Sequence, residues 1–198
     1  PMLDVWFKDE SNGWVVGSYG QIFETKDGGD TWDLISERLD NPDYRHYNGL
    51  YGDQDGRLII AGESGRVYLS QDWGQTWVRN DTGYIGHLYG VETMPSDQGG
   101  MAVLAYGFGG NVFRLGAGAD KWWQLDSPTK ESIVGAAYDG SRVVMVDQAG
   151  RLMTTGQTGV KLNFITTKEG KPVTGMVKVE DKLYLSAQGG PRMLELSQ

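Results

Sequence analysis

The side chains in this sequence that could do chemistry are carboxylates, arginines, tyrosines and two histidines. There are 26 Asp and Glu residues, only His46 and His87 among the histidines, and no cysteine. Without cysteine the chain has no thiolate nucleophile, no disulfide and no zinc–thiolate site. Two histidines are too few for a multi-histidine metal centre, and they do not form a spaced pair on one strand. We therefore expect neither a metal ion nor a cofactor.

Two of the carboxylates stand in a motif that occurs twice. Residues 25–32 read TKDGGDTW and residues 70–77 read SQDWGQTW, so both follow the pattern Ser/Thr-x-Asp-x-Gly-x-Thr-Trp. Their aspartates lie 45 residues apart. Such carboxylates could act in catalysis or bind a metal ion, but the adjoining glycine and threonine are typical of a tight turn. The motif residues are Thr25, Asp27, Gly29, Thr31, Trp32, Ser70, Asp72, Gly74, Thr76 and Trp77.

The segments that must position these motifs repeat as well. Each copy reads as strand, turn, strand, glycine-containing turn, strand, turn and strand. Three weaker copies follow, and the first strands of the five copies are 44, 40, 45 and 40 residues apart. In the two clearest copies, residues 3–7 match 47–52, residues 13–17 match 57–62, and residues 20–25 match 65–70.

Four short strands in every 40 to 45 residues are typical of a propeller blade. The strand segments are too short, too β-branched and too closely bounded by glycine to form helices. The sequence therefore predicts an all-β fold, a β-propeller of four-stranded antiparallel blades, with about five blades in this chain. Residues 36–40 are expected to form one helical turn. We place the blades near residues 3–46, 47–86, 87–131, 132–171 and 172–198 of a single propeller domain or propeller fragment.

In the weaker copies the individual strands are still recognisable. Residues 116–120 replace the motif turn in the third copy, and residues 156–159 replace it in the fourth. The fifth copy offers only three strands before the sequence ends at Gln198. The expected strands are residues 101–106, 111–115, 133–137, 142–146, 151–155, 173–177, 183–186 and 193–196.

The overall charge narrows the range of partners. The net charge is −8 and the isoelectric point is about 4.7, which argues against attraction to nucleic acid or to anionic lipid. No run of about 20 apolar residues is present, so we expect no membrane span. There is also no signal-peptide pattern in this sequence.

The two motifs resemble the Asp-box of the BNR repeat, which is found in sialidases, in related glycosidases and in many non-enzymatic propellers. Residues 12–17, Gly20 and the first motif are most similar to one branch, the photosystem II stability/assembly factor-like propellers of bacteria. This resemblance is specific in the first two blades and rests mainly on spacing afterwards. In that family the full ring has seven blades, so either the ring is smaller here or blades before Pro1 are absent from this sequence. The resemblance also implies an exported protein in the periplasm or outside the cell.

The resemblance also implies a role for the motif. In related propellers it forms the hairpin between the third and fourth strands of a blade. Asp27 and Asp72 would then accept backbone N–H bonds within the turn, and the glycine would take a positive φ. The threonine would close the turn, and Trp32 and Trp77 would pack between neighbouring sheets. We interpret all ten motif residues as fold residues.

A sialidase-like glycosidase is the alternative that the resemblance raises. Such an enzyme needs an arginine triad, a Tyr/Glu nucleophile pair and an acid/base aspartate. The Phe-Arg-Ile-Pro segment of that family is absent, and residues 190–193 are not a version of it. Arg66, Arg114, Arg151 and Arg192 recur with the blades, which favours positions at strand ends. We therefore expect the chain not to be an enzyme.

The loops opposite the motif turns are the expected binding face. Loops on a rigid scaffold carry binding residues, and tyrosine and arginine are favoured in binding patches. Each histidine alone could equally cap a turn. The candidate residues are Tyr44, Arg45, His46, Glu63, Arg66, Tyr84, His87 and Arg151.

Three functions are compatible with this pattern. The first is a non-catalytic interaction or assembly scaffold, similar to the photosystem II assembly factors, that binds a protein or peptide. The second is a propeller that binds or cleaves a glycan, and the third is a structural module of a larger exported protein. We also expect a segment before Pro1 to complete the fifth blade. Without it, the unpaired edge of that blade could join a neighbouring molecule.

Overall fold

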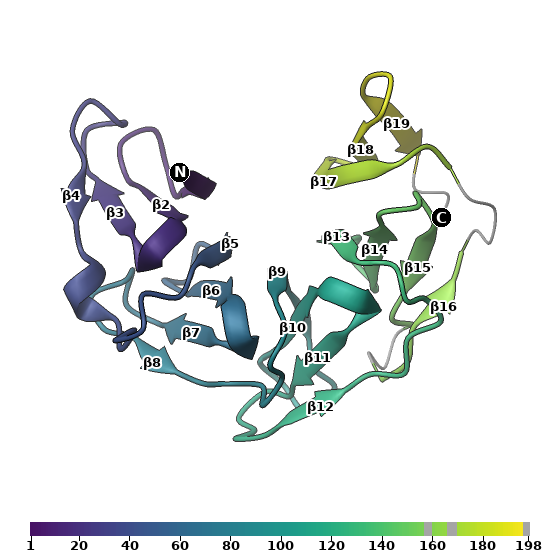
Figure 1. Ribbon diagram of the computed structural model, residues 1–198, viewed down its shortest axis with the longest axis horizontal. Helices are drawn as coiled ribbons and strands as arrows, with labels where there is room; N and C mark the ends of the chain where they lie inside the picture. Colours follow the sequence, from purple (N-terminus) through teal and green to yellow (C-terminus); the bar gives the residue numbers. More distant parts are fainter. Residues whose placement is uncertain (157–159, 166–169, 196–198) are drawn as a thin grey trace. The chain divides into compact units, whose positions relative to one another are not determined.

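The computed structural model describes residues 1–156, 160–165 and 170–195 (Figure 1). The chain forms two compact units, Pro1–Val91 and Glu92–Gln198. The described residues contain strands and short 3-10 turns but no α-helix. The strands form five antiparallel sheets, and in each sheet the order of the strands follows the chain. This confirms the predicted all-β fold and the predicted blade topology.

The first unit contains two four-stranded sheets, which are the first two blades. Each has two well-formed inner hairpins and a fourth strand of only two residues. The strands of the first blade are β1 (Met2–Phe7), β2 (Gly13–Gly17), β3 (Ile22–Thr25) and β4 (Asp33–Leu34). Those of the second are β5 (Tyr47–Gly52), β6 (Leu58–Gly62), β7 (Val67–Ser70) and β8 (Val78–Arg79).

The other three sheets lie mainly in the second unit, although β9 begins just before it. The third blade has β9 (Leu88–Pro95), β10 (Met101–Gly107), β11 (Val112–Leu115) and β12 (Trp122–Gln124). The fourth has β13 (Ile133–Tyr138), β14 (Val143–Asp147), β15 (Leu152–Thr154) and β16 (Asn163–Phe164). The fifth has β17 (Val173–Val179), β18 (Lys182–Ala187) and β19 (Arg192–Glu195), and is three-stranded in the described residues.

The strand boundaries follow the sequence prediction closely. The expected strands of the weaker blades differ from the observed ones by at most two residues at either end. The expected helical turn is a 3-10 turn at Ser36–Arg38. Most of the predicted turn at residues 156–159 and the predicted strand end at Leu196 lie outside the described residues.

The second strand of each of the first four blades is largely buried on both faces, whereas β18 of the fifth blade has exposed side chains at Tyr184 and Ser186. All five residues of β6 and all five of β14 are buried, which explains their continuous apolar sequences. In the first unit, Trp14, Val16 and Ile22 of the first blade form one core with Leu58 and Ile60 of the second. This packing between sheets holds the turns at both ends of the strands in place.

Glycine in the first strands allows neighbouring blades to approach closely. A Cβ atom at Gly135 of β13 would lie 2.6 Å from the Cβ of Met176 on β17. A Cβ atom at Gly52 would lie 2.4 Å from the ring of Trp6. Real Cβ atoms do not approach other atoms so closely, so a larger residue at either position would force the sheets apart.

Candidate functional site

The two Asp-box turns have the same hydrogen bonds. Asp27 Oδ1 accepts the backbone N–H of Thr31 at 2.9 Å, and Oδ2 accepts its hydroxyl at 2.6 Å. Asp72 accepts the N–H and hydroxyl of Thr76 at the same two distances. Gly29 and Gly74 have φ angles of 99° and 74°. The predicted turn geometry is therefore confirmed at both motifs.

These hydrogen bonds also fix the charge of both aspartates. The hydroxyl and N–H of Thr31 lower the pKa of Asp27 to about 2, and the hydroxyl and N–H of Thr76 lower the pKa of Asp72. Thr25 and Ser70 add a further hydroxyl donor to each carboxylate at 2.8 Å. A carboxylate that is ionised and fully engaged with its own turn is poorly suited to proton transfer.

The motif tryptophans differ in their packing. Each donates its indole N–H to the carbonyl of the motif glycine at 3.1 Å. Trp77 packs against the core shared by the first two blades, as predicted. Trp32 is not part of that core, and its ring contacts Phe7 of its own blade with the centroids 6.0 Å apart. The expectation that both tryptophans pack between sheets is therefore wrong for Trp32 in this chain.

At the opposite end of the strands, a strained turn occurs in the first two blades. Tyr19 and Ser64 have φ angles of 60° and 57°, which non-glycine residues rarely adopt. Each precedes a glycine with positive φ. A Cβ atom at the second of these glycines, Gly65, would lie 2.1 Å from the carbonyl oxygen of Tyr84. The turn must therefore be tight, and the side chain before the glycine is held in a fixed direction.

Four side chains meet beside these turns, and we call them the Glu63 cluster: Tyr19, His46, Glu63 and His87. Glu63 Oε2 accepts the backbone N–H of His46 at 3.0 Å. Glu63 Oε1 lies 3.8 Å from His46 Nδ1 and 3.6 Å from His87 Nδ1. The ring of Tyr19 packs edge-on against His46, with the centroids 5.0 Å apart. The cluster thus joins residues from four separate loops.

The cluster is open to solvent. Tyr19 is 67% exposed, and the side chain of His87 is 52% exposed. Glu63 is the most enclosed member, with a side-chain exposure of 20%. Two imidazoles therefore flank a carboxylate that is held by the backbone, and a tyrosine ring packs against one of them. This arrangement can offer aromatic contact and hydrogen bonds to a ligand.

Other candidates from the sequence have supporting roles. The guanidinium of Arg66 is almost buried and bonds to Asn41 Oδ1 at 2.8 Å and to Asp43. Its hydrogen bond and charge lower the pKa of Asp43. Arg66 therefore holds the loop at residues 41–43 in place through these two bonds. Tyr44 is 71% exposed with a φ of 54°, and it remains a candidate for contact with a partner.

Arg45, Tyr84 and Arg151 are not brought into the cluster by any contact described above. The backbone of Arg45 bonds to both ends of the Asn41 amide, and the charge of its side chain helps to lower the pKa of Asp43. The backbone N–H of Tyr84 donates to Thr82 Oγ1 at 3.2 Å. Arg151 lies in the second unit, where it bonds to Asp147 Oδ2 at 2.8 Å and to Thr129 Oγ1 at 2.7 Å. Its recurrence with the blades reflects this structural role.

Tyr19 is the one member of the cluster that sequence reasoning missed. The repeat itself held the signal, because residues 18–20 occupy the same turn as residues 63–65. The second copy was recognised as part of the binding face, but the first was not. Applying the repeat consistently would have added Tyr19 to the candidates.

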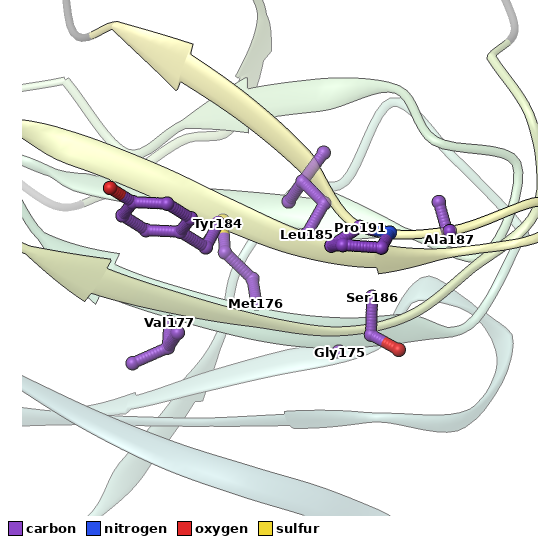
Figure 2. A pocket seen from close by; sticks show the side chains of 9 residues that line it. Gly175, Met176, Val177, Tyr184, Leu185, Ser186, Ala187 and Pro191 are labelled. Carbon is purple, nitrogen blue, oxygen red and sulfur yellow. The ribbon is translucent and has the colours of Figure 1, made fainter.

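A surface cleft lies on the fifth blade, with a volume of about 500 Å³. Figure 2 shows Met176 and Val177 on β17 and Tyr184 and Leu185 on β18, which line this cleft. None of its lining residues is charged. A cleft with an uncharged lining of this kind suits packing against a protein better than recognition of a polar ligand. The expected pairing of this blade with a neighbouring molecule stays a prediction.

The described residues offer no arrangement of three or more His, Cys, Asp or Glu side chains that could hold a metal ion. In the same part of the chain, no helix has the length and apolar character that a membrane span requires.

Solved structures with a similar fold are propellers. Ycf48 bound to D1 peptide has a TM-score of 0.71 at 20% identity, over 98% of this chain and 63% of that one. The WD40 β-propeller domain of Doa1 has a TM-score of 0.70 at 13% identity, over 98% of this chain and 64% of that one. Together with the strand order and the two Asp-box turns, these likenesses define a β-propeller protein with Asp-box turns in its first two blades.

Sequence comparison identifies the family. The model of photosynthesis system II assembly factor Ycf48 matches residues 1–122. The chain belongs to this family, which confirms the resemblance seen in the motifs.

Two curated relatives extend the comparison. The photosystem II assembly lipoprotein Ycf48 of Synechococcus sp. (strain CC9902) is 35% identical over 123 residues, which are 61% of this chain and 35% of that protein. The Ycf48 assembly protein of Thermosynechococcus vestitus is 46% identical over 44 residues, or 22% of this chain and 13% of that protein. The chain thus matches about a third or less of the length of these relatives.

Proposed function

We propose that this chain acts as a non-catalytic assembly scaffold that binds a protein or peptide partner through the Glu63 cluster. The observation that carries the proposal is the cluster itself, in which two histidines flank an anchored carboxylate and a strained tyrosine packs against one of them. Backbone strain is concentrated at functional sites, because a residue such as Tyr19 stays strained only where the surrounding structure enforces it. Its exposed ring is presented to solvent in a fixed position.

Family membership supports the same proposal. The relatives are named as photosystem II assembly proteins, and a Ycf48 structure with a similar fold contains a D1 peptide. Exposed aromatic rings with hydrogen-bonding groups beside them favour the binding of a peptide. Aromatic side chains bury large apolar areas at low entropic cost. We infer that the partner of this chain is an extended protein segment of this type.

Enzymatic activity is not part of the proposal. The Asp-box carboxylates are engaged with their own turns, and Arg66 and Arg151 are held by Asp43 and Asp147. A glycosidase would need free carboxylates and arginines directed toward one substrate. We therefore expect no turnover of a fluorogenic sialoside above the rate of a heat-inactivated sample.

We also propose that the protein is exported. One curated relative is named as a lipoprotein, which supports a location on the far side of a membrane. Fractionation of the source cells, with an antibody to the chain, tests this proposal. Recovery of the protein only from the cytoplasmic fraction would contradict it.

A binding assay with a fluorescent D1 peptide tests the main proposal. We expect saturable binding that His87→Ala or Tyr19→Gly weakens by about tenfold, since exposed aromatic contacts of this kind typically contribute more than 1 kcal/mol. Trp123→Ala is the matched control, because Trp123 is 69% exposed on β12 of the third blade. No binding, or equal affinity for the cluster variants and the parent, would refute the proposal.

A further inference from the structure

The first strands of three blades carry a glycine directly after a shift in strand register. It is Gly49 in β5, Gly135 in β13 and Gly175 in β17. A Cβ atom at Gly49 would lie 2.6 Å from the carbonyl oxygen of Tyr89 on β9, and one at Gly135 would lie 2.6 Å from the Cβ of Met176 on β17. These two glycines therefore make room for the first strand of the next blade.

Gly175 has the same position in the fifth blade but lacks such a neighbour. In the described residues, no atom beyond its own chain neighbours lies within 4 Å of a Cβ atom placed there. Gly175 lines the cleft on the fifth blade, where Figure 2 shows it with Val177 and Ser186. The strand thus keeps the small residue of a blade contact at a place where the described residues supply no second blade.

The residues around Gly175 also have the character of a blade contact. Val177, two residues further along β17, lies on the same face and is 56% exposed. Its cross-strand partner Tyr184 is exposed as well. The equivalent pair in the fourth blade, Ala137 and Val144, is buried against the fifth blade. The open face of the fifth blade is therefore one half of a blade-to-blade contact.

The first blade has an open face on its opposite side. Asp4 and Trp6 of β1 face the second blade, because Asp4 Oδ2 accepts the N–H of Leu50 at 2.7 Å and Trp6 packs on the core that both blades share. Val5 lies between them on the other face of the sheet and is 53% exposed. This face of the first blade is turned away from the second blade.

Val5 has the position in the first blade that Met176 has in the fifth. Both are the second residue after the shift in register, and their cross-strand partners, Val15 and Leu185, are apolar. Met176 packs on the fourth blade, where a glycine makes room for it. By the same repeat, Val5 is the residue that fits the space at Gly175.

We propose that copies of this chain associate head to tail, with the first blade of one copy packed on the fifth blade of another. Val5 fills the space at Gly175, and the apolar side chains of both faces leave water. A second copy is the occupant that the chain itself supplies, because each copy carries both halves of the contact. The contact is separate from the Glu63 cluster and does not depend on the function proposed for it.

Gly175→Val tests the contact without disturbing the fold. The φ of Gly175 lies outside the left-handed region, and its Cβ position is open, so valine fits the isolated chain. The variant should melt like the parent. It should self-associate about tenfold more weakly, because the added side chain occupies the space for Val5. Sedimentation velocity over a range of concentrations measures the association.

Two charge variants show whether the contact joins unlike faces. Val5→Glu and Val177→Glu should each weaken self-association at least about tenfold, since association would bury an unpaired carboxylate. Mixed together they should associate again, because a head-to-tail contact is heterologous and each variant keeps the half that the other has lost. Val78→Glu, at an exposed valine on β8, is the matched control and should associate like the parent.

Association that is lost in each charge variant and restored in their mixture supports the proposal. Circular dichroism melts show that each variant is folded, so that lost association is not lost structure. A parent that stays monomeric at millimolar concentration would overturn the proposal. So would a Gly175→Val variant that associates like the parent, a mixture that stays monomeric, or an equal loss in Val78→Glu.

Discussion

At the scale of single residues, the Asp-box aspartates stabilise turns by accepting hydrogen bonds while ionised. Each carboxylate binds the N–H and hydroxyl of the threonine four residues later. Their lowered pKa means that the folded state binds a proton less readily than the unfolded chain. Their contribution to stability is therefore fully present above the unfolded pKa of about 4 and is lost as the pH falls through the lower folded pKa.

We expect Asp72→Ala to lower the melting temperature by about 2–4 °C at pH 7, because the donors of Thr76 and Ser70 lose their acceptor. Circular dichroism at 218 nm follows the melt, and the same variant should differ less from the parent near pH 2. Asp97→Ala, at an exposed aspartate outside both Asp-box turns, serves as the control. Identical melts for Asp72→Ala and the parent would show that the motif is not stabilising.

Glu92 on β9 should make stability depend on pH in the opposite way. Burial raises its pKa to about 7 despite hydrogen bonds from the N–H groups of Thr93 and Tyr138. Because the folded state binds this proton more tightly, stability declines as the pH rises from about 4.5 through 7.

Glu92→Gln should remove this decline, and the variant should be more stable than the parent by about 1–2 kcal/mol at pH 8. Urea unfolding at pH 5 and pH 8 measures the difference. A parent whose stability is the same at both values, or a variant that is less stable at pH 8, would contradict the assignment.

At the scale of elements, each blade is positioned by turns with demanding backbone geometry. The turn after the second strand places Tyr19 and Ser64 at positive φ, where glycine would fit without strain. The same turn in the third blade has Gly109 at this position, with a φ of 67°. The tyrosine and serine are therefore conformationally costly choices.

Ser64→Gly should stabilise the chain by about 0.5–1 kcal/mol, because the relief of strain exceeds the added freedom of the unfolded chain. The turn should keep its shape, so the affinity for a D1 peptide should change little. Urea unfolding and the fluorescent peptide assay measure the two effects. A destabilised Ser64→Gly variant would show that the serine side chain, and not the backbone, determines this turn.

The repeat explains why so much of the element structure could be predicted. Alternating apolar residues and paired turn motifs defined the strands of all five blades to within a few residues, because local patterning determines strands. The contacts between elements were harder to foresee. Trp32 packs against Phe7, and Arg66 bonds to Asn41 and Asp43 instead of facing a partner. Both contacts depend on which blades and loops meet in space.

At the scale of the whole molecule, function is assigned to the end of the strands opposite the Asp-box turns. The Glu63 cluster at that end is proposed to bind a peptide. Sequence reasoning found three of the four cluster residues from loop position and residue type.

Hydrogen–deuterium exchange of the chain with and without a D1 peptide tests the central claim most directly, because it reports where the peptide lies. If the Glu63 cluster is the binding site, amide exchange should slow in the loops around residues 17–21, 45–47, 62–66 and 84–88. Exchange at the Asp-box turns, residues 27–32 and 72–77, should be unchanged. Slower exchange only at the Asp-box turns, or no change anywhere at saturating peptide, would contradict the account.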